Sequence, residues 1–289
     1  METIRRSYSI FRQSLSVLSK DKEILIFPFL SGVITILAFA TMIFGGMTTG
    51  FFERVSGDRS LQSNLLGYAG MFVWYFVSWF IVLFFNVAVI HCAKIRLAGG
   101  DPTIADGFSA AMQHVGRIAM WALISATVGL ILRVIAERAK ILGRIITGIL
   151  GAAWSIATYF IVPVMIFEKR SLRDSVRQST QLIAKTWGES LVAAGGIGAF
   201  SMLLAIGGLA APIIGLFISP LAALVGLALM IVYWIALSVV TAALSGIFRT
   251  ALYLYATEGR TPPAFTAGYV QQAFAVKPPK KVFGFSVSS

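Results

Sequence analysis

The run from Leu65 to His91, LLGYAGMFVWYFVSWFIVLFFNVAVIH, decides the fold because it carries no charged residue. It is longer than the roughly 20 apolar residues that a helix needs to cross a bilayer. Its apolar residues are continuous and do not alternate with polar ones, so the pattern favours a helix over a strand of a membrane barrel. A similar uncharged run occupies 24–44. The chain is therefore expected to be an integral membrane protein.

The composition extends this interpretation to the whole chain. Of 289 residues, 57% are hydrophobic and 12% are charged, whereas a soluble domain carries about 25% charged residues. A chain with so little charge cannot cover a globule of this size with polar surface, which excludes an ordinary soluble protein. The single cysteine, Cys92, cannot form an internal disulfide, so a disulfide scaffold is excluded as well.

Six apolar runs predict an all-α fold, a polytopic membrane helical bundle with six transmembrane helices. The predicted spans are about 24–44, 65–91, 118–132, 145–167, 191–217 and 221–248. They belong to a single transmembrane domain, 1–260, which is followed by a cytoplasmic tail, 261–289.

The distribution of Lys and Arg predicts the orientation. Eighteen of these residues fall at the termini and the second and fourth connections between spans, and six fall on the other side. Positive residues concentrate in cytoplasmic segments, so both termini are expected on the cytoplasmic side of the membrane. Topology and attraction to anionic headgroups then account for the net charge of +12, and nucleic acid is not expected as a partner.

Three cytoplasmic segments have the apolar spacing of amphipathic helices at the membrane interface, at about 3–19, 103–115 and 171–187. The first places its apolar residues at Ile4, Tyr8, Phe11, Leu15 and Leu18. The chain can thus be divided into three units of one interfacial helix and two spans. The spacing alone leaves open whether these units are true repeats.

Helix-start signals precede two of these segments. Asp101, Pro102 and Thr103 resemble a helix start, and Ser171 with Asp174 resembles a capping box.

No catalytic or metal site stands out in the sequence. None of the twelve carboxylates lies in the middle of a predicted span, which argues against a proton-coupled carrier. The pair His91 and Cys92 has one further histidine, His114, and no further cysteine, too few for a four-ligand zinc site built from these residues. We therefore expect neither a cofactor nor enzymatic activity.

Three polar residues are candidates for a transport path, namely Asn86 in the second span, His91 at its end and Arg133 after the third. Each has a simpler interpretation. His91 would contact headgroups or loop carbonyls, and Arg133 would extend its charge to the headgroup layer.

Small residues recur along one face of the fifth span at Ala194, Gly198, Ser201, Ala205 and Gly208. Small residues allow helices to approach closely in a bilayer. This helix-packing seam is expected to pack against another span of the chain, or alternatively to form a homo-oligomer contact or a hinge.

Three stretches together resemble a known family: DKEILIFPFLSG at 21–32, VPVMIFE at 162–168, and SVRQS at 175–179 with KTWGE at 185–189. The family consists of uncharacterised bacterial and archaeal multi-pass membrane proteins known only as a domain of unknown function. The likeness covers about Arg6 to Gly259 and implies six helices and a prokaryotic source, but no activity. The organisation also resembles the membrane domain of some glycerophosphodiester phosphodiesterases, although this chain has no phosphodiesterase barrel.

Two functions from different classes fit these patterns. The first is a non-enzymatic membrane scaffold or accessory subunit, favoured by the interfacial helices and the absence of charge within the spans. The second is a transporter or channel for a small or lipid-like solute, favoured by the six spans and Asn86. The expected partners are membrane lipids with anionic headgroups at the cytoplasmic face, together with a second copy or another membrane protein.

Overall fold

The computed structural model describes residues 12–57, 61–138, 140–168 and 170–259 of the chain, and these residues form helices and turns without a strand. The long helices are α2 (Ile26–Thr48), α4 (Leu61–Leu97), α6 (Val115–Arg138), α7 (Lys140–Ala157), α9 (Leu172–Gly207) and α11 (Pro220–Glu258). The short ones are η1 (Lys22–Leu25), α3 (Phe51–Gly57), α5 (Ile104–Gln113), α8 (Ile161–Phe167) and α10 (Ala210–Ile218), and residues 12–20 are also helical. Six helical stretches are long and apolar enough to cross a membrane, which confirms the predicted all-α, six-span fold.

The structure moves several predicted boundaries. The third stretch extends from Val115 to Glu137, rather than 118–132, because α6 continues without a break through its charged end. The fourth is divided between α7 and α8, and the sixth continues beyond 248 to Glu258. The predicted interfacial helix 171–187 is not separate, because α9 runs on into the fifth span, whose described apolar stretch ends at Ile218.

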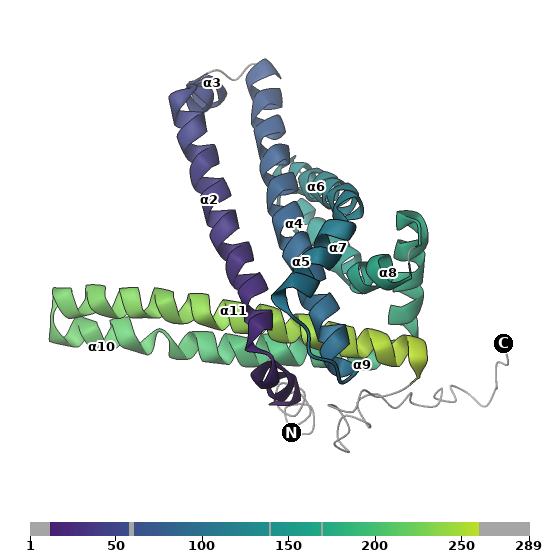
Figure 1. Cartoon of the computed structure of the whole chain (residues 1–289). Coiled ribbons are helices and arrows are strands. Elements are labelled where there is room, and N and C mark those ends of the chain that lie inside the picture. The colour runs from purple at the N-terminus through teal and green to yellow at the C-terminus, as the bar shows by residue number, and fades with distance from the viewer. Residues whose placement is uncertain (1–11, 58–60, 139, 169, 260–289) are drawn as a thin grey trace, which may run out of the picture.

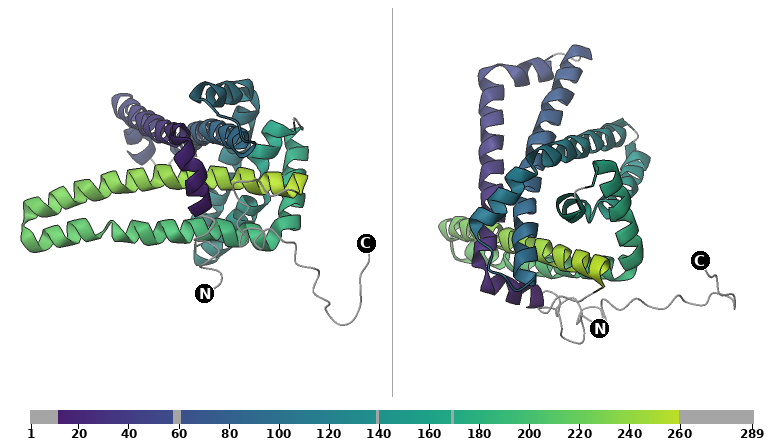
Figure 2. Two further views of the ribbon diagram at one scale, coloured as in Figure 1. Left: turned by 60° about the horizontal axis from the view of Figure 1, so that its bottom comes forward. Right: turned by 45° about the vertical axis from the view of Figure 1, so that its right-hand side comes forward.

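The helices form three pairs that leave a common centre in different directions (Figure 1). In Figure 1, α2 and α4 rise as one arm capped by α3, while α10 and α11 extend to the left as a second arm. The third pair is α6 and α7, of which α6 packs against α4, and α8 also contacts α4. Figure 2 shows the same separation of the two arms from other directions. We call them the α2–α4 arm and the α10–α11 arm.

The buried core lies where the three pairs meet, and we call this region the junction. It is built from the start of α2, the second half of α4, the first half of α6, and from α5, α8 and the end of α11. Its largest fully buried side chains include Phe27, Ile90, Phe160, Met165 and Phe248. By contrast, the outer parts of the arms expose apolar side chains, as expected for surfaces that face lipid.

Hydrogen bonds and an ion pair stabilise the junction. The hydroxyl of Tyr253 on α11 donates to Oε1 of Glu168 after α8 at 2.9 Å, and Arg170 Nε lies 2.6 Å from the other carboxylate oxygen. Arg117 at the start of α6 donates to the backbone carbonyl of Met165 at 2.9 Å. These contacts join the start of α6 to the ends of α8 and α11.

The turn after α4 depends on a glycine. Gly99 has a φ of 90°, a left-handed conformation that L side chains rarely adopt. The backbone N–H of Gly100 donates to Ile95 and that of Gly99 to Arg96, which is the Schellman arrangement for ending a helix. This turn places α5 against α4.

The N-terminal helical segment is described from residue 12 onward, so only part of the predicted apolar stripe can be placed. Ser14, Val17 and Leu18 are buried, whereas Leu15 is 40% exposed. Leu18 is the one described member of the predicted stripe that packs into the core; Ile4, Tyr8 and Phe11 lie outside the described residues. The segment docks on the junction, and this contact decides the buried face.

Candidate functional site

A lateral pocket of about 610 Å³ lies between α2, α4 and α11, beside the junction. Its apolar lining comes from side chains one and two helical turns apart on each helix. The lining residues are Pro28, Phe29, Ser31, Gly32, Val33, Thr35 and Ile36 of α2, Val82, Phe85, Asn86 and Val89 of α4, and Ile235, Ser238, Val239 and Ala242 of α11. The volume falls within the range of about 300–1,000 Å³ that is usual for small-molecule sites.

Two polar groups in the wall of the lateral pocket have unsatisfied hydrogen-bonding capacity. Asn86 Oδ1 and Thr35 Oγ1 are buried and make no hydrogen bond within the described part of the chain. Both residues lie inside predicted spans, where an unsatisfied polar group costs several kcal/mol. Both oxygens are closed to solvent as the side chains lie, so a ligand or water that bonds them requires a change of rotamer and would then recover this free energy.

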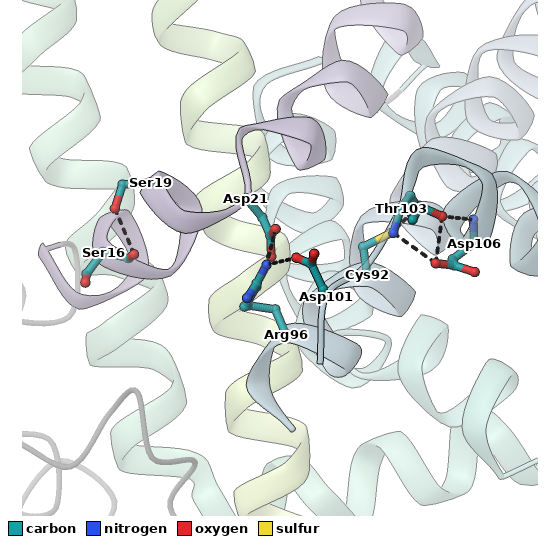
Figure 3. A network of polar contacts seen from close by, with 8 residues as sticks. All are labelled: Ser16, Ser19, Asp21, Cys92, Arg96, Asp101, Thr103 and Asp106. Atoms are coloured by element: carbon teal, nitrogen blue, oxygen red, sulfur yellow. Dashed lines mark hydrogen bonds and ion pairs between the residues drawn. The ribbon is translucent and has the colours of Figure 1, made fainter. Parts of the chain in front are cut away.

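A polar network closes the base of the α2–α4 arm (Figure 3). The guanidinium of Arg96, near the end of α4, binds both carboxylate oxygens of Asp21, just before η1. A third bond joins Arg96 to Asp101. Asp21 is only 6% exposed, whereas Asp101 is 90% exposed. The pair with Asp21 is thus the buried one, and its forked geometry fixes both partners.

The next turn of the chain starts α5 with a capping box. Asp106 N–H donates to the hydroxyl of Thr103 at 3.2 Å, and Thr103 N–H donates to Asp106 Oδ2 at 2.9 Å (Figure 3). The Thr103 N–H and its hydroxyl both bond the ionised carboxylate, so they lower the pKa of Asp106 below its usual value. The predicted helix start is confirmed, with Thr103 as its N-cap.

A second pocket of about 340 Å³ lies between the end of α4, α5 and the end of α8. We call it the interface pocket. It combines charged, polar and apolar side chains: His91 and Lys94 of α4, Asp106, Ser109, Ala110, Gln113 and His114 in and after α5, and Ile166 and Phe167 of α8. The Lys94 ammonium lies 4.0 Å from the centre of the Phe167 ring, which holds the charge beside the pocket.

The structure separates the three predicted transport-path residues. Asn86 lines the lateral pocket and His91 lines the interface pocket. Arg133 lies on α6 outside both linings, is 51% exposed, and pairs with Glu137 at 2.8 Å. The three residues do not form one path. Sequence reasoning missed Thr35 and Lys94 as lining residues, and it treated Arg96 only as a topology signal.

The predicted seam is only partly a contact between helices. Ser201 Oγ lies 3.0 Å from Thr241 Oγ1 of α11, and the Trp234 indole donates to the carbonyl of Ala205 at 3.0 Å. A Cβ on Gly208 would come within 2.8 Å of Tyr233 Cδ1, so the helices approach closely there. The side chain of Ala194 lies outside the described part.

Gly198 does not take part in this contact. It is exposed, and among the described residues no atom of a neighbouring segment lies within 4 Å of the position that a Cβ would occupy. The closest approach lies further along, where a Cβ on Gly215 or Gly226 would meet backbone of the other helix at 2.5 or 2.6 Å. The close contact between small residues thus lies mainly between α10 and α11, and Gly198 is not part of it.

No metal centre is evident in the described part of the chain, where no three His, Cys, Asp or Glu side chains cluster closely enough to hold an ion. Cys92 is buried, and its thiol lies 3.6 Å from the carbonyl of Thr103 as a weak donor. This thiol therefore helps to hold the start of α5 against α4.

The comparisons with known proteins show the family of the chain. The model of a family of unknown function, DUF6159, matches residues 65–263, so the chain belongs to that family. The match includes two of the three family-like stretches, at 162–168 and 175–189, and leaves 21–32 outside. No curated protein matches the chain, and neither comparison supports the resemblance to glycerophosphodiester phosphodiesterases.

Proposed function

We propose that this membrane protein binds a lipid-like molecule in the lateral pocket and carries it within or across the bilayer, without changing it chemically. The observation that carries the proposal is the pocket itself, an apolar space of about 610 Å³ among three helices that are apolar enough to span a membrane. A tightly packed bundle would have favoured a static scaffold. An open, apolar site beside lipid-facing surface favours a ligand that comes from the bilayer.

The lining indicates the kind of ligand. Most of the wall is aliphatic or aromatic, which suits an acyl chain or a similar apolar group. The unsatisfied oxygens of Asn86 and Thr35 would favour a ligand that also carries a hydroxyl or amide donor. The described residues of this pocket include no carboxylate, histidine or cysteine, so we propose binding and movement instead of catalysis.

A steric block of the pocket tests this function. Ala242 is an exposed residue of α11 that lines the pocket, and Ala242→Trp would place an indole inside it. We expect the purified variant to retain at least about fivefold less co-purified lipid, measured by native mass spectrometry, as for a loss of about 1 kcal/mol in binding. Transfer of a fluorescent phospholipid analogue in proteoliposomes should fall in parallel.

The matched control is Ala228→Trp, the same change at an exposed position of α11 outside the pocket lining. It should leave lipid retention and transfer unchanged. Equal retention by both variants and the parent would rule out the lateral pocket as the ligand site.

A scaffold or accessory role remains our second proposal, and the shape of the α10–α11 arm supports it. This arm projects from the junction and ends in exposed apolar side chains, with Phe217 87% exposed and Leu216 72% exposed. Photo-crosslinking in cells distinguishes the two functions. A reactive residue at Phe217 should give one reproducible protein adduct if the arm binds a partner, whereas one at Ala242 should capture lipid if the pocket is used.

We also propose a prokaryotic plasma membrane as the location, with both termini and the junction on the cytoplasmic side next to anionic lipid. The support is the 18 to 6 distribution of Lys and Arg. In a Cys92→Ser background, a cysteine at Ser60 should react with an impermeant reagent from outside, and one at Ser286 should not. External labelling at Ser286 would contradict this orientation.

A further inference from the structure

The interface pocket is a separate site from the lateral pocket. At about 100° per residue, His91 lies about 140° round α4 from Asn86 and Lys94 about 140° from Val89, so the two pockets use different faces of this helix. The backbone of α4 thus stands between the two spaces. One ligand group cannot fill both, so the interface pocket needs an account of its own.

The interface pocket contains one charge of each sign. Lys94 supplies an ammonium beside the Phe167 ring, and Asp106 supplies a carboxylate. The capping bonds lower the pKa of Asp106, so this carboxylate is ionised at neutral pH. The nearby Glu168 is already bonded to Tyr253 and paired with Arg170. The ammonium of Lys94 and the carboxylate of Asp106 therefore balance each other within the pocket.

The remaining polar groups can bond a ligand from several sides. His114 Nδ1 lies 2.8 Å from the carbonyl of Ala110, so this nitrogen carries the proton and Nε2 is left to face other partners. Gln113 Nε2 donates to Ser109 Oγ at 3.1 Å, which leaves the Ser109 hydroxyl proton and the Gln113 carbonyl oxygen for a ligand. Asp106 accepts the bonds from the Thr103 N–H and hydroxyl on Oδ2, and no described group bonds its other oxygen.

We propose that the interface pocket binds a zwitterionic phosphoethanolamine headgroup, with its phosphate toward Lys94 and its ammonium toward Asp106. A purely anionic ligand would be repelled by Asp106, and a purely cationic one by Lys94, whereas a ligand with both charges satisfies both. The volume of about 340 Å³ is small for a whole lipid and suits a headgroup. The pocket lies at the end of the α4 span, where the headgroups of one leaflet are found.

Lipid selectivity tests this inference. The purified protein would be titrated, by native mass spectrometry, with phosphatidylethanolamine and with phosphatidylglycerol of the same acyl chains. We expect about tenfold tighter binding of phosphatidylethanolamine, the effect of one charge-assisted contact. Asp106→Asn removes the charge that pairs with the ammonium and should abolish this preference, whereas Lys94→Gln removes the phosphate contact and should weaken the binding of both lipids. Lys22→Gln removes an exposed lysine outside the pocket and should leave the binding of both lipids unchanged.

A second pair of variants covers the case in which Asp106→Asn fails to fold. Ser109→Trp fills the pocket from the exposed face of α5, while Ala105→Trp adds the same bulk to that helix outside the pocket. The first should remove the preference for phosphatidylethanolamine and the second should not. If both tryptophan variants select lipids as the parent does, the inference is wrong.

Two soluble probes identify the source of the headgroup. Glycerophosphoethanolamine that competes as strongly as the lipid would support the headgroup chemistry and indicate an aqueous ligand, whereas competition by the lipid alone would indicate the membrane. Inorganic phosphate that competes equally well would overturn the zwitterionic site. Each result is independent of the lateral pocket, because Ala242→Trp should leave this selectivity unchanged.

Discussion

The α10–α11 arm and the α2–α4 arm are held together in different ways. In the α10–α11 arm, Gly215 and Gly226 are buried and bring the two backbones into contact. In the α2–α4 arm, Gly32 and Gly45 face open space, and side chains such as Phe39 and Trp74, with ring centres 5.0 Å apart, make the contact. The first arm is closed along its length, while the second leaves room between its helices and α11.

This difference locates the movable part of the molecule. Backbone contact through glycine permits little adjustment, because no side chain is present to change its rotamer. The α2–α4 arm is instead fastened at its base, where Arg96 binds Asp21, and the lateral pocket lies beside that base. We therefore expect the α10–α11 arm to stay rigid and the α2–α4 arm to move away from α11 when a ligand enters the lateral pocket.

The largest effect should follow from breaking the ion pair between Arg96 and Asp21 at the base of the α2–α4 arm. Arg96→Gln leaves the buried Asp21 carboxylate without its cation, and we expect a loss of about 3 kcal/mol in stability, as for other broken buried pairs. Thermal unfolding in detergent would measure it. Asp101→Asn removes only the exposed partner of Arg96 and should cost less than about 1 kcal/mol. Similar losses from both changes would mean that burial of Asp21 is not what makes the contact strong.

A smaller effect is expected from adding bulk to the closed arm. Gly226→Leu would force its side chain against the backbone at Ala211 and Pro212, and we expect a cost of about 2 kcal/mol from overpacking. Gly198→Leu, the same change in open space, should leave the melting temperature almost unchanged. The comparison of the arms would fail if Gly198→Leu were the more damaging variant, since a contact at Gly198 would then exist in the membrane.

The sequence predicted the spans well because hydropathy is a property of each segment alone. The run 65–91 is apolar whatever packs against it, and it lies within a spanning helix. The continuity of α9 was missed because the charged residues of 172–185 resemble an interfacial helix. Charge indicates the surroundings of a helix but does not end it, and Pro is absent between Leu172 and Gly207.

The sites depended on contacts between distant segments, which one sequence does not reveal. Arg96 is 75 residues from Asp21, and nothing in either segment shows that they meet. Asn86 was recognised because an amide within an apolar run is conspicuous, but the neighbours that make it part of a pocket come from α2 and α11. The seam was predicted from small residues alone, whereas the path of α11 determines which of them make contact.

The smallest effect should come from the unsatisfied amide in the lateral pocket. Asn86→Leu replaces a buried oxygen that has no partner among the described residues with an apolar group of similar size. We expect the lipid-free variant to be more stable by about 1 kcal/mol, because the cost of burying an unpaired polar group is removed. Bound lipid should reverse this order. A ligand stabilises a protein in proportion to how tightly the folded state binds it, and the variant would lack the hydrogen bond that a lipid donor makes with Asn86. Melting curves recorded with and without added lipid would therefore cross. A variant that is less stable than the parent in both conditions would show that Asn86 is satisfied within the protein and that the lateral pocket has no polar anchor at this position.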